Sequence, residues 1–182
     1  MRPILVQPHS DDAVLFACWT LLRVKPLVVT VFDGHVQQMR GLPITPKMRR
    51  DEDKAAMEIL GLPEPIYLGF TDDSEPSDGA IFNRLCQCVR GLSDQDLYIP
   101  MEESGGHAQH NLVWLACECL PHTKAYLTYT TRGKSTSANE VPFEPEWIGL
   151  KLRALACFES QWLPAAGCAE HFIGRSLREY LL

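Results

Sequence analysis

The sequence predicts a single α/β domain over residues 1–182, with a mostly parallel sheet of about five or more strands flanked by helices. Two observations favour this fold class. Short apolar runs alternate along the chain with longer segments of helical periodicity, which is typical of a doubly wound sheet covered on both faces. The length of 182 residues, with 46% hydrophobic and 22% charged residues, suits one globular domain with a sizeable core.

Five short segments have the apolar character of buried parallel strands. They are Ile4–Gln7, Leu27–Phe32, Ile66–Leu68, Leu97–Ile99 and Ala125–Thr128. Turn-forming residues follow several of them, such as the Asp33-Gly34 pair and Pro100.

The segments between these strands have the apolar spacing of amphipathic helices. The expected helices cover residues 11–22, 48–60, 79–92, 109–120 and 146–158. Loops are expected at 35–47, 71–78 and 130–144, which are rich in turn-forming or polar residues. The tail, 161–182, has a weaker pattern that allows a short terminal helix.

Charge and hydropathy narrow the classes of partner. The net charge of −6 argues against nucleic acid or an anionic membrane surface as the main partner, because both attract basic proteins. No signal peptide is evident, and no apolar run approaches the roughly 18 residues of a spanning helix. We therefore expect a cytoplasmic protein without a membrane anchor.

Seven cysteines include two C-x-C pairs, Cys86/Cys88 and Cys117/Cys119, both within expected helices. Residues two apart point to different sides of a helix, which suits neither a zinc knuckle nor a redox pair. We expect free thiols that behave as small hydrophobic side chains.

Two polar clusters follow expected strands. The first runs from Pro8 to Asp12, directly after the first strand, and the second runs from Gly105 to His110, after the fourth. Ligands of doubly wound sheets bind outside the carboxyl ends of the strands. We therefore expect the two clusters to meet there.

These clusters contain the groups that a hydrolytic metal site requires. His9, Asp12 and His110 supply two imidazoles and a carboxylate, a ligand set that favours one divalent metal ion, with Zn²⁺ first among several possible ions. Asp11 is then a spare carboxylate that can accept a proton from an activated water. His107, when protonated, can stabilise an oxyanion or donate to a leaving amine.

Each residue taken alone has a simpler interpretation. Asp11 and Asp12 have the positions of an N-cap and a first-turn charge, and the two histidines of a His-x-x-His pair are often surface residues. Their joint placement at one edge of the sheet favours the metal site. Arg132-Gly133-Lys134-Ser135 is better interpreted as a solvated loop than as an anion site. Nucleotide-binding glycine motifs and a serine-hydrolase elbow are not evident in the sequence.

Four motifs in order resemble the PIG-L/LmbE-like family of zinc-dependent N-acetylglucosamine deacetylases. The usual His-Pro-Asp-Asp motif stands here as His9-Ser10-Asp11-Asp12, and the His-x-x-His motif as His107 and His110. The helical pattern R-x-x-E-x-x-x-A-x-x-x-L-G is matched by Arg49, Glu52, Ala56, Leu60 and Gly61. A late K…A-L…S-Q pattern is matched by Lys151, Ala154, Leu155, Ser160 and Gln161.

The resemblance implies a Rossmann-like fold and a zinc-dependent N-deacetylase that releases acetate from a small-molecule N-acetyl amino sugar or sugar conjugate. It implies zinc ligation by His9, Asp12 and His110, with Asp11 as general base and His107 stabilising the oxyanion. Arg49 would face the substrate, or be a solvated charge at a helix start.

Two residues depart from the family pattern. Ser10 replaces a proline, and Gln109 replaces the aspartate of His-x-Asp-His, which should shift the pH optimum more than the activity. The chain is also shorter than many relatives, so a second subunit in a homo-oligomer is one way to complete the substrate site.

Other functions remain open from the sequence. One is a catalytically silent metal- or sugar-binding protein of the same fold. Another is a hydrolase of a different amide or ester. A metal phosphoesterase is a third, although such enzymes often use two metals and more carboxylates.

Overall fold

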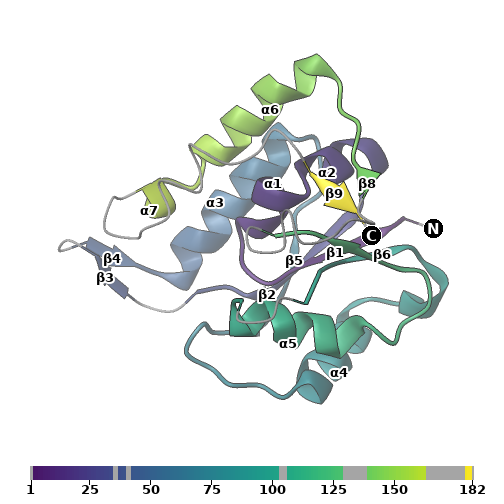
Figure 1. The fold of residues 1–182 in the computed structure, drawn as a ribbon. Coiled ribbons are helices and arrows are strands. Elements are labelled where there is room, and N and C mark those ends of the chain that lie inside the picture. The colour runs from purple at the N-terminus through teal and green to yellow at the C-terminus, as the bar shows by residue number, and fades with distance from the viewer. Residues whose placement is uncertain are drawn as a thin grey trace.

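A computed structural model describes residues 2–34, 37–39, 42–102, 106–128, 139–162 and 179–181. It contains a seven-stranded sheet and a separate two-stranded hairpin (Figure 1). In spatial order the strands of the sheet are β5 (Ile66–Phe70), β2 (Leu27–Phe32), β1 (Ile4–Gln7), β6 (Leu97–Pro100), β7 (Thr123–Tyr126), β9 (Tyr180–Leu181) and β8 (Asn139–Glu140). The first five are parallel to one another, and β9 pairs antiparallel with both β7 and β8. The predicted α/β fold with a mostly parallel sheet is thus confirmed.

Helices cover both faces of this sheet, as Figure 1 shows. One face carries α1 (Asp12–Phe16), α2 (Cys18–Val24), α3 (Pro46–Ile59) and α6 (Pro145–Ala156), and the other carries α4 (Asp78–Cys88) and α5 (Ala108–Cys117). Alternate residues of a strand point to opposite faces. Leu5 of β1 accordingly belongs to the first core, and its neighbours Ile4 and Val6 belong to the second.

The predicted elements are largely present, with shifted ends. The first two strands have the predicted bounds, whereas β7 begins two residues before the predicted Ala125. Helix α3 begins earlier than predicted because the Thr45 hydroxyl accepts a hydrogen bond from the Met48 N–H, and Pro46 occupies the first turn. A short 3₁₀ turn, η1 (Leu92–Asp94), and a short helix, α7 (Glu159–Trp162), complete the described helices.

The prediction of one helix over residues 11–22 is wrong, because two helices, α1 and α2, meet at Ala17. In a continuous helix the Trp19 N–H would donate to the Leu15 carbonyl. Here it donates to Glu179 Oε2 at 2.7 Å, while Lys151 Nζ donates to the Leu15 carbonyl at 3.1 Å. Lys151 and Glu179 also form a buried ion pair of 2.5 Å. Side chains from distant segments thus replace a helical hydrogen bond and break the helix.

One further prediction of local structure is wrong. The segment 35–47, predicted as a loop, contains a hairpin of β3 (Gln37–Met39) and β4 (Leu42–Ile44), with Gln37 opposite Ile44. Of the tail, 161–182, the structure describes only residues 161–162, which lie in a short helix, and residues 179–181, where strand β9 pairs Leu181 with Tyr126 of the sheet; the rest of the tail lies outside the described residues. Strands this short depend on their pairing partners and carry little sequence signal. Residues 132–135, predicted as a solvated loop, lie outside the described residues.

Other expectations concern cysteines and membrane spans. Six cysteines are described, and all six are free thiols, among them buried Cys18 and Cys117 and exposed Cys86 and Cys119. Within the described ranges, none of the helices combines the length and apolar character needed to cross a bilayer.

A buried polar cluster lies between α3 and the sheet. Asp53 of α3 is fully buried, and its Oδ2 accepts hydrogen bonds from Gln7 Nε2, the Thr30 hydroxyl and the Tyr67 hydroxyl. Gln7 Oε1 in turn accepts from the Ala13 N–H of α1 at 3.0 Å. Burial raises the pKa of Asp53 from 3.8 to about 7, although the three donors act in the opposite direction.

Replacing Asp53 with Asn should remove a pH dependence of stability. A folded-state pKa raised above the unfolded one stabilises the protein below the unfolded pKa, and this contribution is lost as pH rises through the folded pKa. Between pH 4 and 7, taken from the shift of Asp53, we expect wild type to lose up to about 4 kcal/mol relative to Asp53→Asn. Urea unfolding at several pH values measures this, with exposed Asp51→Asn on the same helix as control. Parallel pH profiles for wild type and Asp53→Asn would contradict it.

Candidate metal centre

The two polar clusters of the sequence meet at the point where the strand order reverses. From β1 the chain builds β2 and β5 on one side, and then returns to place β6 and β7 on the other. The loops leaving β1 and β6 therefore diverge and leave a crevice at their carboxyl ends. His9 follows β1, and His107 and His110 lie at the start of α5, which follows β6.

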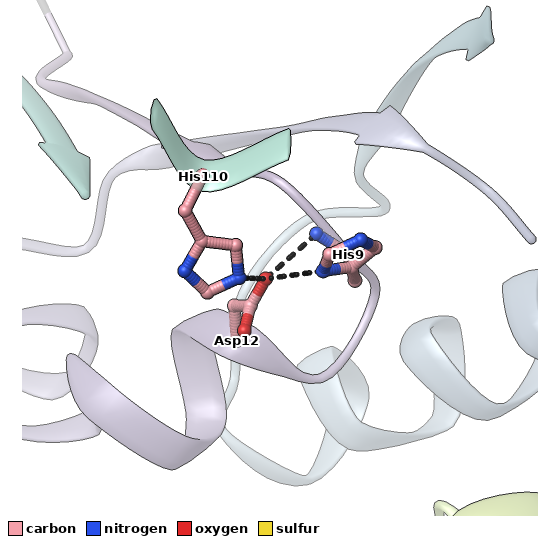
Figure 2. Close-up of side chains that lie close together, drawn as sticks. All are labelled: His9, Asp12 and His110. Atoms are coloured by element: carbon pink, nitrogen blue, oxygen red, sulfur yellow. Dashed lines mark hydrogen bonds and ion pairs between the residues drawn. The ribbon is translucent and has the colours of Figure 1, made fainter. Parts of the chain in front are cut away.

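The side chains of His9, Asp12 and His110 converge on one carboxylate oxygen (Figure 2). Asp12 Oδ2 lies 3.1 Å from His9 Nδ1 and 3.2 Å from His110 Nε2. One potential ligand atom from each residue lies within 4.8 Å of the other two. His110 is 0% exposed and Asp12 is 3% exposed. Two imidazoles and one carboxylate are the protein donors of many hydrolytic zinc sites, so this set fits a single divalent ion.

Local hydrogen bonds hold the first two of these residues together. Asp12 Oδ2 accepts from the His9 backbone N–H at 2.8 Å, and the Asp12 N–H donates to the His9 carbonyl at 3.3 Å. Ser10, in place of the family's proline, is buried inside this turn. The short spacing from His9 to Asp12 thus closes a turn and presents both side chains on the same side.

The ionisation of this cluster is coupled. Burial by itself would raise the pKa of Asp12, but His110 and His9 hold it below its usual value. Burial opposes a charged His9, yet Asp12, with a smaller contribution from Gln109, raises its pKa to about 9. The Asp12 carboxylate therefore favours a positive charge between itself and the imidazoles.

Asp11 does not act as a helix cap, although it occupies the N-cap position of α1. Its side chain caps no helical N–H, and its Oδ1 instead accepts from Arg49 Nη2 at 3.1 Å. Arg49 is 7% exposed, and its Nη1 lies 3.5 Å from the Ser160 hydroxyl oxygen. Burial opposes its charge, but Asp11 and Glu52 raise the pKa of Arg49. Arg49 therefore lies inside the site and holds the spare carboxylate.

Glu52 anchors this arrangement to the short helix α7. One Glu52 oxygen accepts from the Ser160 N–H and the other from the Ser160 hydroxyl, both at 2.7 Å. Arg49 Nη1 lies 3.8 Å from Glu52 Oε2. The sequence indicated Ser160 only as part of the late family motif, and that motif did not predict that Ser160 lies beside Glu52 and Arg49.

His107 lies beside the metal-ligand candidates but remains exposed. Its ring makes an edge contact with that of His9, with ring centroids 4.8 Å apart. His107 Nδ1 accepts from the Gln109 N–H at 3.3 Å and so caps α5. Partial desolvation by the surrounding protein, together with the neighbouring imidazoles of His9 and His110, lowers the pKa of His107. Both observations favour a neutral His107 ring with its proton on Nε2.

Gln109, the departure from the family pattern, bridges the rim of the site. Its Oε1 lies 2.7 Å from His9 Nε2, and its Nε2 donates to the Asp72 carbonyl at 2.9 Å. The Asp72 carboxylate accepts from the Gly34 N–H at 3.1 Å. Gly34 has φ +86, and a Cβ there would lie 3.2 Å from Arg49 Cγ, so glycine fits this position. Asp72 was missed because it lies in an expected loop without a recognisable motif.

Solved structures of similar fold include two deacetylases. Teicoplanin deacetylase in its zinc-inhibited form matches with TM-score 0.73 and 18% identity, over 100% of this chain and 97% of that one. N,N′-diacetylchitobiose deacetylase from Pyrococcus horikoshii matches with TM-score 0.69 and 18% identity, over 100% and 82%. The 4-carboxy-2-hydroxymuconate hydratase GalB from Pseudomonas putida matches with TM-score 0.68 and 17% identity, over 100% and 95%. At these identities the likeness establishes the fold.

A comparison with curated protein sequences finds no match. A family description, PIG-L: GlcNAc-PI de-N-acetylase, matches residues 4–118, which is more than half of the chain. The matched range contains His9, Asp11, Asp12, Arg49 and His110, the residues that the structure brings together at the switch point. On this match, the chain belongs to the PIG-L family.

Proposed function

We propose that this protein is a metal-dependent N-deacetylase that removes an acetyl group from an N-acetylated amino sugar or sugar conjugate. The observation that carries the proposal is the convergence of His9 and His110 on one oxygen of Asp12, which directly follows a second aspartate, Asp11, in the chain. Such a site offers three candidate ligands for a cation and, in Asp11, a second carboxylate that is not one of those ligands. Family membership and the deacetylases of similar fold support the same chemistry.

The His9, Asp12 and His110 side chains would hold one divalent ion, for which Zn²⁺ is the first choice. When bound, such an ion polarises a carbonyl and lowers the pKa of a water molecule toward about 7. Asp11 accepts the proton of the attacking water on its carboxylate. The amide C–N bond then breaks, the nitrogen takes up a proton, and acetate and a free amine are the products.

Arg49 and His107 have supporting roles in this proposal. Arg49 binds one oxygen of Asp11 and thereby orients the other toward the reaction, so it acts as a positioning residue. The neutral His107 ring donates from Nε2 to the oxyanion that forms from the acetyl carbonyl. The role of Arg49 differs from the substrate contact implied by the sequence resemblance, because its guanidinium is buried against Asp11 and Ser160.

GalB, a hydratase of similar fold, shows why the reaction needs its own test. A fold can host several chemistries, so activity must be argued from the site. A hydratase and a silent binding protein are the two alternatives that acetate release distinguishes from a deacetylase.

Acetate release from a panel of N-acetylglucosamine conjugates should require a bound metal. We expect chelated protein to release no acetate, and about one Zn²⁺ per chain to restore release, because three ligands bind one ion. Zinc is added stoichiometrically, since one similar deacetylase is known in a zinc-inhibited form. His110→Ala should fail to recover, whereas His122→Asn, an exposed position with φ 60 that asparagine tolerates, should recover fully. Metal binding without acetate from any conjugate would contradict the deacetylase.

Asp11→Asn should separate catalysis from metal binding. The amide keeps the shape of the side chain but cannot accept the proton, so we expect kcat to fall by about 10²- to 10⁴-fold with zinc content unchanged. Steady-state kinetics and metal analysis on the same sample measure both quantities. Asp51→Asn, an exposed aspartate of α3, is the matched control. Loss of zinc from Asp11→Asn would mean that Asp11 is a ligand instead.

Arg49→Lys tests whether Arg49 positions Asp11 or binds substrate. Lysine keeps the charge but has one nitrogen in place of the rigid pair that contacts Asp11 and Ser160, so we expect kcat to fall about 10-fold or more and KM to change little. Arg90→Lys, at an exposed position, controls for the exchange itself. A raised KM with unchanged kcat would assign Arg49 to substrate binding.

A further inference from the structure

We propose that Gln109 is a positioning residue that fixes the orientation of the His9 ring, so that Nδ1 is the nitrogen presented to the metal. This inference rests on the proposed metal site at His9, Asp12 and His110. Its evidence is separate from the ligand set, because it comes from hydrogen bonds on the opposite side of the His9 ring.

The two ends of the Gln109 amide have distinguishable partners. Its nitrogen lies 2.9 Å from the Asp72 carbonyl oxygen, which only accepts hydrogen bonds. The amide must therefore direct its NH₂ group to Asp72 and its oxygen to His9. An amide oxygen also only accepts, so His9 Nε2, at 2.7 Å, must carry a proton.

This assignment leaves His9 Nδ1 as the nitrogen that can bind a cation. Nδ1 lies 3.1 Å from Asp12 Oδ2, on the side of the ring where the three candidate ligands converge. Without a metal, a proton on Nδ1 makes this contact a hydrogen bond to Asp12, and a bound cation would take the place of that proton. Gln109 thus sets the tautomer of His9 and directs its free lone pair to the cation site.

The glutamine also ties this orientation to the surrounding loops. Gln109 lies in the first turn of α5, Asp72 follows β5, and His9 follows β1. The Asp72 carboxylate further binds the Gly34 N–H after β2. An aspartate or glutamate at position 109 could accept from His9 but could not donate to the Asp72 carbonyl. The amide is therefore suited to hold both a metal-ligand candidate and a loop at the rim.

Zinc affinity of two variants tests this role. Gln109→Met has similar length but no polar group, and we expect it to bind Zn²⁺ about 10- to 100-fold more weakly, as is typical when the partner of a metal-bound histidine is lost. Gln109→Glu keeps an acceptor for His9 but loses the donor to the Asp72 carbonyl, so we expect it to weaken Zn²⁺ binding less than Gln109→Met does. Competition with a colorimetric chelator measures the affinities, and Gln87→Met on the exposed side of α4 is the matched control.

A second measurement uses wild-type protein and so does not depend on a variant that folds. ¹⁵N NMR of the histidine rings in zinc-loaded protein should show His9 with a proton on Nε2 and the metal on Nδ1. Metal on His9 Nε2 would overturn the inference.

The zinc affinities of the two variants can also contradict the inference. Unchanged zinc affinity of Gln109→Met, or equal weakening of Gln109→Met and Gln109→Glu, would overturn the inference, because neither follows from a lost acceptor on His9. In both cases the proposed function still stands, since wild type binds zinc. Wild-type protein that binds no zinc would instead overturn the proposed function and this inference together.

Discussion

The carboxylate of Asp12 is the interaction on which the site depends. One oxygen of this residue accepts the His9 backbone N–H, lies against His9 Nδ1, and lies against His110 Nε2 (Figure 2). The first contact closes the turn after β1, and the last joins α1 to α5 across the switch point of the sheet. A buried carboxylate so surrounded is stable only with positive charge beside it. The same oxygen therefore organises the turn, the interhelical contact and the candidate metal site.

Around this centre, two chains of hydrogen bonds hold the neighbouring groups from different sides. Arg49, with Glu52 and Ser160, holds Asp11 from the side of α3 and α7. Gln109, with Asp72, holds His9 from the side of α5 and the loop after β5. Side chains that act on a substrate must be fixed within narrow limits, and packing alone rarely fixes polar groups. These residues place each functional group through a partner that is itself anchored.

Buried polar groups also shape the helical layer that supports the site. The Lys151–Glu179 pair interrupts the helix that follows the turn carrying His9 and Asp12, and it joins the residue before β9 to α2 and α6. Asp53 joins α3 to β1 and β2 through Gln7 and Thr30, directly beneath the turn that carries His9. Removing one partner from either arrangement would leave a buried charged or polar group without its partner and destabilise the fold. In return, each fixes the position of α1 relative to its neighbours.

The sequence by itself determined the alternating strands and helices and the bounds of β1 and β2, because apolar periodicity and short turns are local properties. It indicated His9, Asp12 and His110 as one set of candidate ligands, because the alternating pattern places the ends of their strands at one edge of the sheet. It also indicated Gln109 as unusual, without its partners. Only the tertiary structure decided that Asp11 pairs with Arg49 and that the helix breaks at Ala17. Each of these depends on contacts between residues distant in the chain, such as Glu179 at Trp19 and Ser160 at Glu52. No periodicity within one segment encodes such contacts, because they exist only once the sheet has brought those segments together.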